Sequence, residues 1–186
     1  MLDTSGSMAY FDDNQCLSYI NGWGVPVYYG TGSENITATV PYKRNFCKNS
    51  KGYKVASYDR LTRLKDGMFA FLDSTDPNLT QVLVGLGHYS VLNEDGNGDG
   101  RSARILVPAK ELGEVGSQHR SALKVAIKDL KATGGTPTAH AYAEAASYLM
   151  GTSTLESIKL TNASLYFSYT ERNCNKWGCN EIEYHK

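Results

Sequence analysis

The feature that most constrains this chain is a run of oxygen-bearing side chains on alternate positions near its start. Asp3, Ser5 and Ser7 form an Asp-x-Ser-x-Ser pattern, and Gly6 separates the two serines. Glycine tolerates tight backbone turns, so all three side chains could face one point. A carboxylate and hydroxyl groups suit a hard cation such as Mg²⁺, which takes oxygen ligands in near-octahedral geometry. The pattern therefore predicts the first half of a divalent-metal site.

The same pattern has a plainer interpretation as a capped turn, because Asp and Ser side chains also bond to nearby backbone amides. A second polar loop favours the metal interpretation. It reads Gly-Gly-Thr-Pro-Thr over residues 134–138, more than a hundred residues further along the chain, and it opens an alanine-rich segment. Two such loops at helix starts are a stronger signal than either loop alone.

Apolar periodicity gives the expected order of the elements. Helical spacing of apolar residues predicts three helices: 58–73, 117–132 and 136–150. Runs of β-branched and apolar residues predict two paired strands: 79–92 and 103–109. Residues 9–57 show little periodicity and many glycines and prolines, so we expect an insertion or a long loop there. Helices alternating with apolar strands indicate an α/β sandwich, with 1–186 as a single domain.

The two polar loops together resemble the metal-ion-dependent adhesion site of the von Willebrand factor A (vWA) domain, a Rossmann-like three-layer sandwich. In that family the Asp-x-Ser-x-Ser loop follows the first strand, and a threonine of a distant loop supplies a further oxygen. Carried over position by position, the resemblance assigns ligand roles to Asp3, Ser5, Ser7 and Thr136. It implies Mg²⁺, or Mn²⁺ or Ca²⁺, as the bound ion, and it covers residues 2–8 and about 58–151.

Two parts of the family pattern are missing from this chain. The third loop of the family supplies another aspartate, usually in a Thr-Asp-Gly setting, and nothing in 155–186 matches it. Only Met1 and Leu2 precede Asp3, so most of the first strand is also missing. We therefore expect an incomplete vWA-like domain that holds its metal weakly. In this interpretation 9–57 is an insertion after the first metal loop, and 155–186 is a cysteine-containing insertion or tail.

Within the family, the chain looks most like the N-terminal part of bacterial type IV pilus tip-associated proteins (the PilC/PilY family). The match rests on Leu-Asp-Thr-Ser-Gly-Ser-Met, on the Tyr- and Cys-containing insertion after it, and on Gly-Gly-Thr-Pro-Thr-Ala-x-Ala before a helix that ends at Gly151. It implies an extracellular module for cell adhesion and pilus (fimbrium) biogenesis, at the pilus tip or associated with the outer membrane. The implied partner is an acidic group of a host-surface or pilus protein.

Two other functions fit the resemblance. One is an intracellular assembly module, as in the vWA domains of chelatase or ATPase complexes. The other is a structural or mechanosensing element of the pilus tip with a vestigial metal site. The first of these is distinguished from an extracellular module by the state of the cysteines, because disulfides form outside the cytosol and free thiols persist inside it.

Four cysteines provide that distinction: Cys16, Cys47, Cys174 and Cys179. An even number in segments rich in Tyr, Asn, Gly and Ser is typical of secreted proteins. The most local of three possible connectivities pairs Cys16 with Cys47 and Cys174 with Cys179. Free buried thiols are the alternative.

A second possible metal site lies between the two predicted strands. Asn93, Asp95, Asn97 and Asp99 place oxygen side chains on alternate positions before a glycine, which is how a calcium loop begins. An EF-hand would need a bidentate Glu at its twelfth position, and Leu106 occupies that place. A partial Ca²⁺ loop and a glycine-rich hairpin turn therefore both remain open.

Several classes of function are disfavoured. Nineteen basic and nineteen acidic residues balance, and no basic stripe suggests a nucleic-acid partner. No apolar run approaches the roughly 20 residues of a membrane span. The four histidines are scattered, and no Gly-x-Ser-x-Gly, His-Glu-x-x-His or Walker motif occurs. We therefore expect a binding protein and not an enzyme.

Overall fold

A mixed three-stranded sheet lies at the centre of the computed structural model, which describes residues 1–90, 103–152, 168–175 and 178–185. The strands are β1 (Leu2–Asp3), β7 (Leu83–Tyr89) and β8 (Arg104–Glu111), in the order β1-β7-β8. β1 runs parallel to β7, with Asp3 opposite Tyr89, and β7 is antiparallel to β8. The predicted pairing of the two apolar runs is therefore confirmed.

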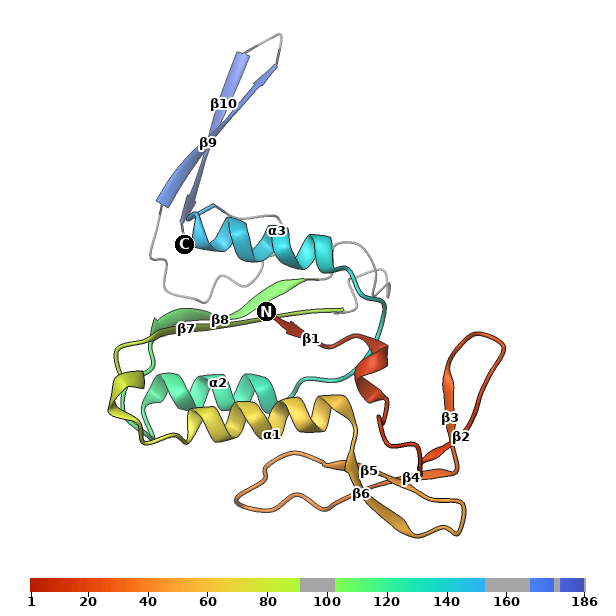
Figure 1. Ribbon diagram of the computed structural model, residues 1–186. Coiled ribbons are helices and arrows are strands. Elements are labelled where there is room, and N and C mark those ends of the chain that lie inside the picture. Colours follow the sequence, from red (N-terminus) through yellow and green to blue (C-terminus); the bar gives the residue numbers. More distant parts are fainter. Residues whose placement is uncertain (91–102, 153–167, 176–177, 186) are drawn as a thin grey trace.

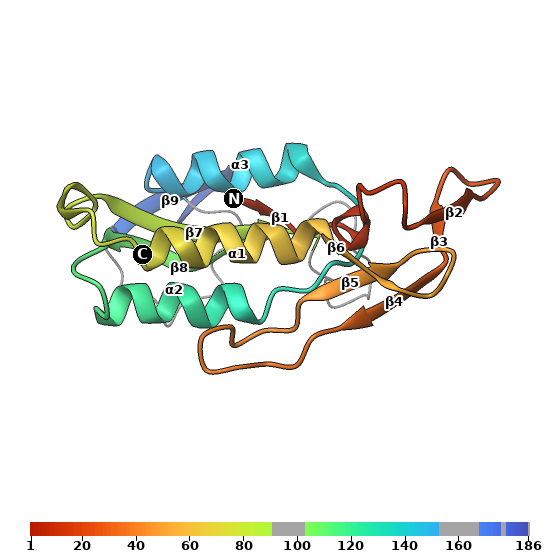
Figure 2. The same ribbon diagram turned by 60° about the horizontal axis from the view of Figure 1, so that its bottom comes forward.

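Helices cover both faces of this sheet, which gives the α/β architecture three layers. The helices are α1 (Arg60–Leu72), α2 (Gln118–Lys128) and α3 (Thr138–Leu149). Figure 1 shows α3 on one face of the sheet and α1 and α2 side by side on the other, and Figure 2 shows the same layers after rotation. Two short 3₁₀ helices, η1 (Gly6–Ala9) and η2 (Pro77–Leu79), follow β1 and precede β7.

Local chemistry explains where the helices begin. Asp59 precedes α1 and accepts a hydrogen bond from the Thr62 amide, and Ser117 does the same for the Arg120 amide at the start of α2. α3 has no side-chain cap, and Pro137 is the residue that immediately precedes it. The helix predicted over residues 136–150 therefore begins slightly later than expected, at Thr138.

The main core fills the space between the sheet and the pair α1 and α2. Its buried members come from these elements and the segments beside them: Tyr42, Leu61, Phe69, Leu72, Leu86, Leu112, Leu123, Ile127 and Leu130. Arg120 is also only 1% exposed, and its guanidinium donates to the carbonyl oxygens of Leu72, Gly113 and Ser74. These bonds satisfy a buried charge and tie the end of α1 to the start of α2.

The segment 9–57 is not a long loop, because four short strands lie within it and a fifth runs from it to Tyr58: β2 (Leu17–Ile20), β3 (Pro26–Tyr28), β4 (Gly30–Ser33), β5 (Asn45–Lys48) and β6 (Lys54–Tyr58). They form the pair β2-β3 and the sheet β4-β5-β6. A small separate core of Phe11, Cys16, Cys47 and Val55 supports them. Strands of three to five residues with a small buried face leave too little alternation to be recognised from sequence.

The predicted disulfide between Cys16 and Cys47 is present, with Cα atoms 5.6 Å apart and both side chains fully buried. Cys174 and Cys179 lie on an antiparallel hairpin of β9 (Ser168–Asn175) and β10 (Gly178–His185), at directly opposite positions of the register. None of the helices in the described ranges is long and apolar enough to cross a membrane.

Candidate metal site

The loop after β1 brings the predicted oxygen ligands together. The amide of Ser5 donates to Oδ1 of Asp3 at 2.7 Å, and the hydroxyl oxygens of Ser5 and Ser7 lie 3.1 Å apart. Adjacent ligands of an octahedral ion with bonds of about 2.1 Å are about 3.0 Å apart. The two serine hydroxyls therefore already have a spacing that suits neighbouring positions on Mg²⁺.

The second predicted loop packs directly against the first through backbone contacts. The Gly6 amide donates to the Gly134 carbonyl at 3.0 Å, and the Thr133 amide donates to the Thr4 carbonyl at 2.8 Å. A Cβ atom on Gly6 would lie 3.3 Å from the Gly134 oxygen, which is tighter than an ordinary contact. Glycine at position 6 therefore permits the close approach of two loops that are far apart in sequence.

Thr136 lies two residues beyond this junction, on an exposed part of the loop. Its carbonyl accepts a bond from the Thr138 amide at 2.8 Å. The structure thus joins the two predicted loops through backbone hydrogen bonds. The described residues show no hydrogen bond from the Thr136 side chain to the other three predicted ligands.

The end of β7 is hydrogen-bonded to both loops, a contact that the sequence did not predict. The buried Thr4 hydroxyl donates to the Tyr89 carbonyl and lies 3.2 Å from Nδ1 of His88. The Ser90 hydroxyl donates to the Gly135 carbonyl, from a backbone with φ of 70°. The position of Ser90 at the end of a predicted strand was the available signal, but a lone serine carries no pattern that distinguishes it from a turn residue.

Tyr89 also contacts the carboxylate that the metal would use. Burial first, and then the charge and the hydrogen bond of Asp3, raise the pKa of Tyr89 above its usual 10. The Asp3 carboxylate therefore lies close enough to the Tyr89 phenol to act on it electrostatically, and the Ser5 amide holds Asp3 within the loop.

Acidification is expected to destabilise the fold through His88. Burial, with the Arg104 charge as a smaller cause, lowers the pKa of His88 from 6.5 to about 4. The unfolded chain binds this proton at higher pH than the folded chain, so stability present at neutral pH is lost as the pH falls through this window. The expected loss between about pH 7 and about pH 5 is about 2 kcal/mol, which urea unfolding can measure.

The matched variant for this prediction is His88→Gln, which keeps a polar side chain but does not titrate. Its unfolding free energy should fall less steeply over the same pH range than that of the parent protein. Equal slopes for the two proteins would assign the acid sensitivity to another group.

The side chains that most often bind metals do not gather elsewhere in the described residues. The described part of the chain contains no cluster of three or more His, Cys, Asp or Glu side chains suited to one ion. The candidate site instead offers one carboxylate and several hydroxyls. The calcium candidates Asn93, Asp95, Asn97 and Asp99 lie outside the described residues.

Comparison with known proteins identifies no relative of this chain. No family model matches the chain, and neither curated proteins nor solved structures give a significant match. The vWA and pilus-tip resemblance therefore remains a prediction from the motif residues.

Proposed function

We propose that this chain is a metal-dependent adhesion module of the vWA type, which binds an acidic group of a partner protein through a divalent cation. Asp3, Ser5, Ser7 and Thr136 are the proposed ligands. The observation that carries the proposal is the hydrogen-bonded junction between the Asp3 loop and the Gly134 loop. The mixed sheet with helices on both faces supports it, because both loops lie at one end of this sheet.

The ligand set explains why such a site would bind a partner and not catalyse a reaction. One carboxylate and neutral hydroxyls leave a divalent ion with surplus positive charge, and ligand positions not filled by protein hold exchangeable water. A carboxylate of a partner can replace one of these waters. Mg²⁺ is the proposed ion because it prefers oxygen ligands and retains several waters, with Mn²⁺ or Ca²⁺ as substitutes.

The Cys16–Cys47 disulfide supports an extracellular location, which is the environment of a pilus tip or another cell-surface protein. It disfavours the alternative of an intracellular module in a chelatase or ATPase complex. A structural pilus-tip element with a vestigial metal site is a second candidate, since the disulfide would also let such an element bear load.

The function is tested by Mg²⁺-dependent binding of an Asp-containing peptide, with an Asn-containing peptide as the neutral control. We expect binding of the Asp peptide in Mg²⁺ and its loss in EDTA. Thr136→Ala should weaken it at least about tenfold, the loss typical of removing a group that supports a metal site. The titration can be followed by calorimetry or NMR.

Thr138→Ala is the matched control for this variant, because Thr138 is two residues away at the start of α3 and is also exposed. It should bind as the parent does. Binding that persists in EDTA, or that is equal for the Asn peptide, would contradict a metal-bridged carboxylate.

A further inference from the structure

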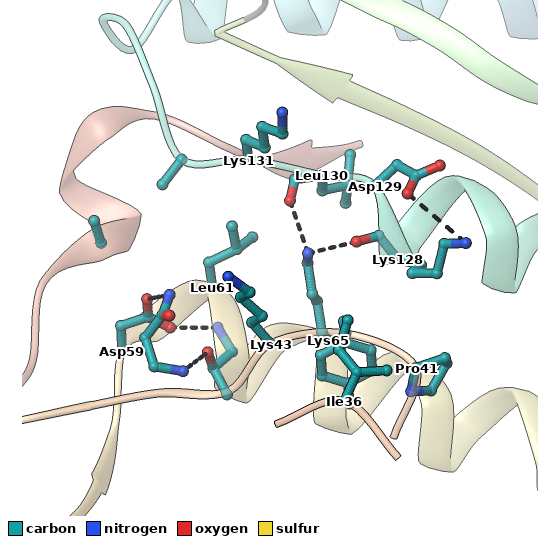
Figure 3. A pocket seen from close by; sticks show the side chains of 15 residues that line it. Ile36, Pro41, Lys43, Asp59, Leu61, Lys65, Lys128, Asp129, Leu130 and Lys131 are labelled. Carbon is teal, nitrogen blue, oxygen red and sulfur yellow. Dashed lines mark hydrogen bonds and ion pairs between the residues drawn. The ribbon is translucent and has the colours of Figure 1, made fainter. Parts of the chain in front are cut away.

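A cavity of about 650 Å³ lies between the 36–45 segment, α1 and the end of α2 with the chain that follows it, and Ala9 of η1 also lines it. Figure 3 shows the Lys65 side chain rising from α1 into this space, with the Lys43 side chain entering beside it. The volume is in the range of small-molecule sites, which are usually about 300–1,000 Å³. The chemistry of its walls indicates what it could hold.

The lining carries more positive than negative charge. Lys43, Lys65, Lys128 and Lys131 line the cavity, against two carboxylates. One of these carboxylates is already occupied: the Asp59 oxygens accept bonds from the Thr62 amide and from the Asn45 side chain, each at 2.7 Å.

The second carboxylate, Asp129, points largely into solvent, with 71% of its side chain exposed and its Oδ1 atom 4.0 Å from Nζ of Lys128. The cavity lining keeps a surplus of ammonium groups over carboxylates, and Asp59 and Asp129 both interact electrostatically with Lys65.

Lys65 is the fixed part of this positive wall. The residue is 6% exposed, and its Nζ donates to the carbonyl oxygens of Lys128 at 2.8 Å and Leu130 at 2.7 Å. An ammonium group has three protons, so two bonds leave one for a further acceptor. The two carbonyls hold the charge in place without neutralising it, which preorganises it for a ligand.

Much of the remaining wall is apolar, although Asn45 and Thr62 also line it. Ile36, Pro41 and Leu61 line the cavity, and Ile36 is 57% exposed although it is a large aliphatic residue. A ligand with a short hydrocarbon body would cover this surface and gain the free energy of its burial.

We propose that this cavity is a metal-independent binding site for a small organic anion, with its acidic head beside Lys43 and Lys65 and its apolar body against Ile36, Pro41 and Leu61. A lysine ammonium acts as a point charge, so the head can be a carboxylate or a phosphate. The site is independent of the metal proposal, because none of the proposed metal ligands lines it.

The test uses hexanoate, hexyl phosphate and the neutral analogue hexanamide, titrated into the full chain in EDTA and followed by NMR. We expect saturable shifts at cavity residues with at least one anion, with Kd on the order of millimolar for so small a ligand. Hexanamide should bind at least about tenfold more weakly, since it lacks the charge-assisted bond. The stronger of the two anions identifies the head group.

Lys43→Ala should weaken anion binding about tenfold, the effect of losing one charge-assisted contact. Lys51→Ala is the matched control, because Lys51 is an exposed lysine of the same insertion that does not line the cavity. Asp3→Ala should leave anion binding unchanged, which separates this site from the metal site. No saturable shift with either anion, equal binding of hexanamide, or equal effects of the two lysine variants would overturn the proposal.

Discussion

Replacing Asp3 with alanine is expected to lower the affinity for Mg²⁺ by at least about a hundredfold, while the protein remains folded. Asp3 supplies the carboxylate of the proposed ligand set, and a hard divalent ion depends on that charge more than on neutral hydroxyls. The fold loses the bond that Asp3 makes to the Ser5 amide, at a cost of about 1–2 kcal/mol. Calorimetry with Mg²⁺ and thermal unfolding measure the two effects separately.

Asp13→Ala is the matched control for this variant. The Asp13 carboxylate accepts a bond from the Gln15 amide at 2.9 Å, the same local pattern that Asp3 makes with Ser5. Asp13→Ala therefore removes an equivalent turn without touching the proposed site. Equal Mg²⁺ binding by Asp3→Ala and the parent would mean that the Asp3 loop is only a capped turn.

Removing the Cys16–Cys47 disulfide is expected to cost about 3–4 kcal/mol of unfolding free energy. The bond closes a loop with a sequence separation of 31, and loop closure of that length predicts a loss of this size. Both cysteines are fully buried in the small core beneath β2–β6, so the effect should concentrate there. Urea unfolding of the Cys16→Ala/Cys47→Ala protein measures the loss of unfolding free energy. Amide hydrogen exchange of β4–β6 shows whether the loss is concentrated in these strands.

A stability change below about 1 kcal/mol in the double variant would show that the small core around Cys16 and Cys47 is held by other contacts. The native redox state is checked separately, by the mass of the unreduced protein before and after reduction. An unreduced protein with free thiols at Cys16 and Cys47 would favour the intracellular alternative.

Helices α1 and α2 could be predicted because each buries an apolar stripe, and β7 and β8 because each is largely a run of apolar residues. In α1, Leu61, Phe69 and Leu72 recur at helical spacing and are all buried. The strands of the segment 9–58 could not be predicted in the same way. These strands are short, and they are held by a disulfide and by paired charges such as Arg44 with Asp66, which leave no apolar period in the sequence.

The candidate site was predictable from residue types, but its support was not. Asp3, Ser5 and Ser7 form a pattern within a single loop, which sequence can show. The junction depends instead on backbone amides and carbonyls of Gly6 and Gly134, which every residue carries and which therefore leave no sequence signal.

The central claim is that the Asp3 loop and the loop carrying Thr136 share one divalent ion, and paramagnetic broadening of NMR signals by Mn²⁺ tests it most directly. The amides of residues 3–7 and 134–136 should broaden together at low Mn²⁺, and excess Mg²⁺ should restore them. Broadening confined to one of the two loops, or none at either, would contradict the claim.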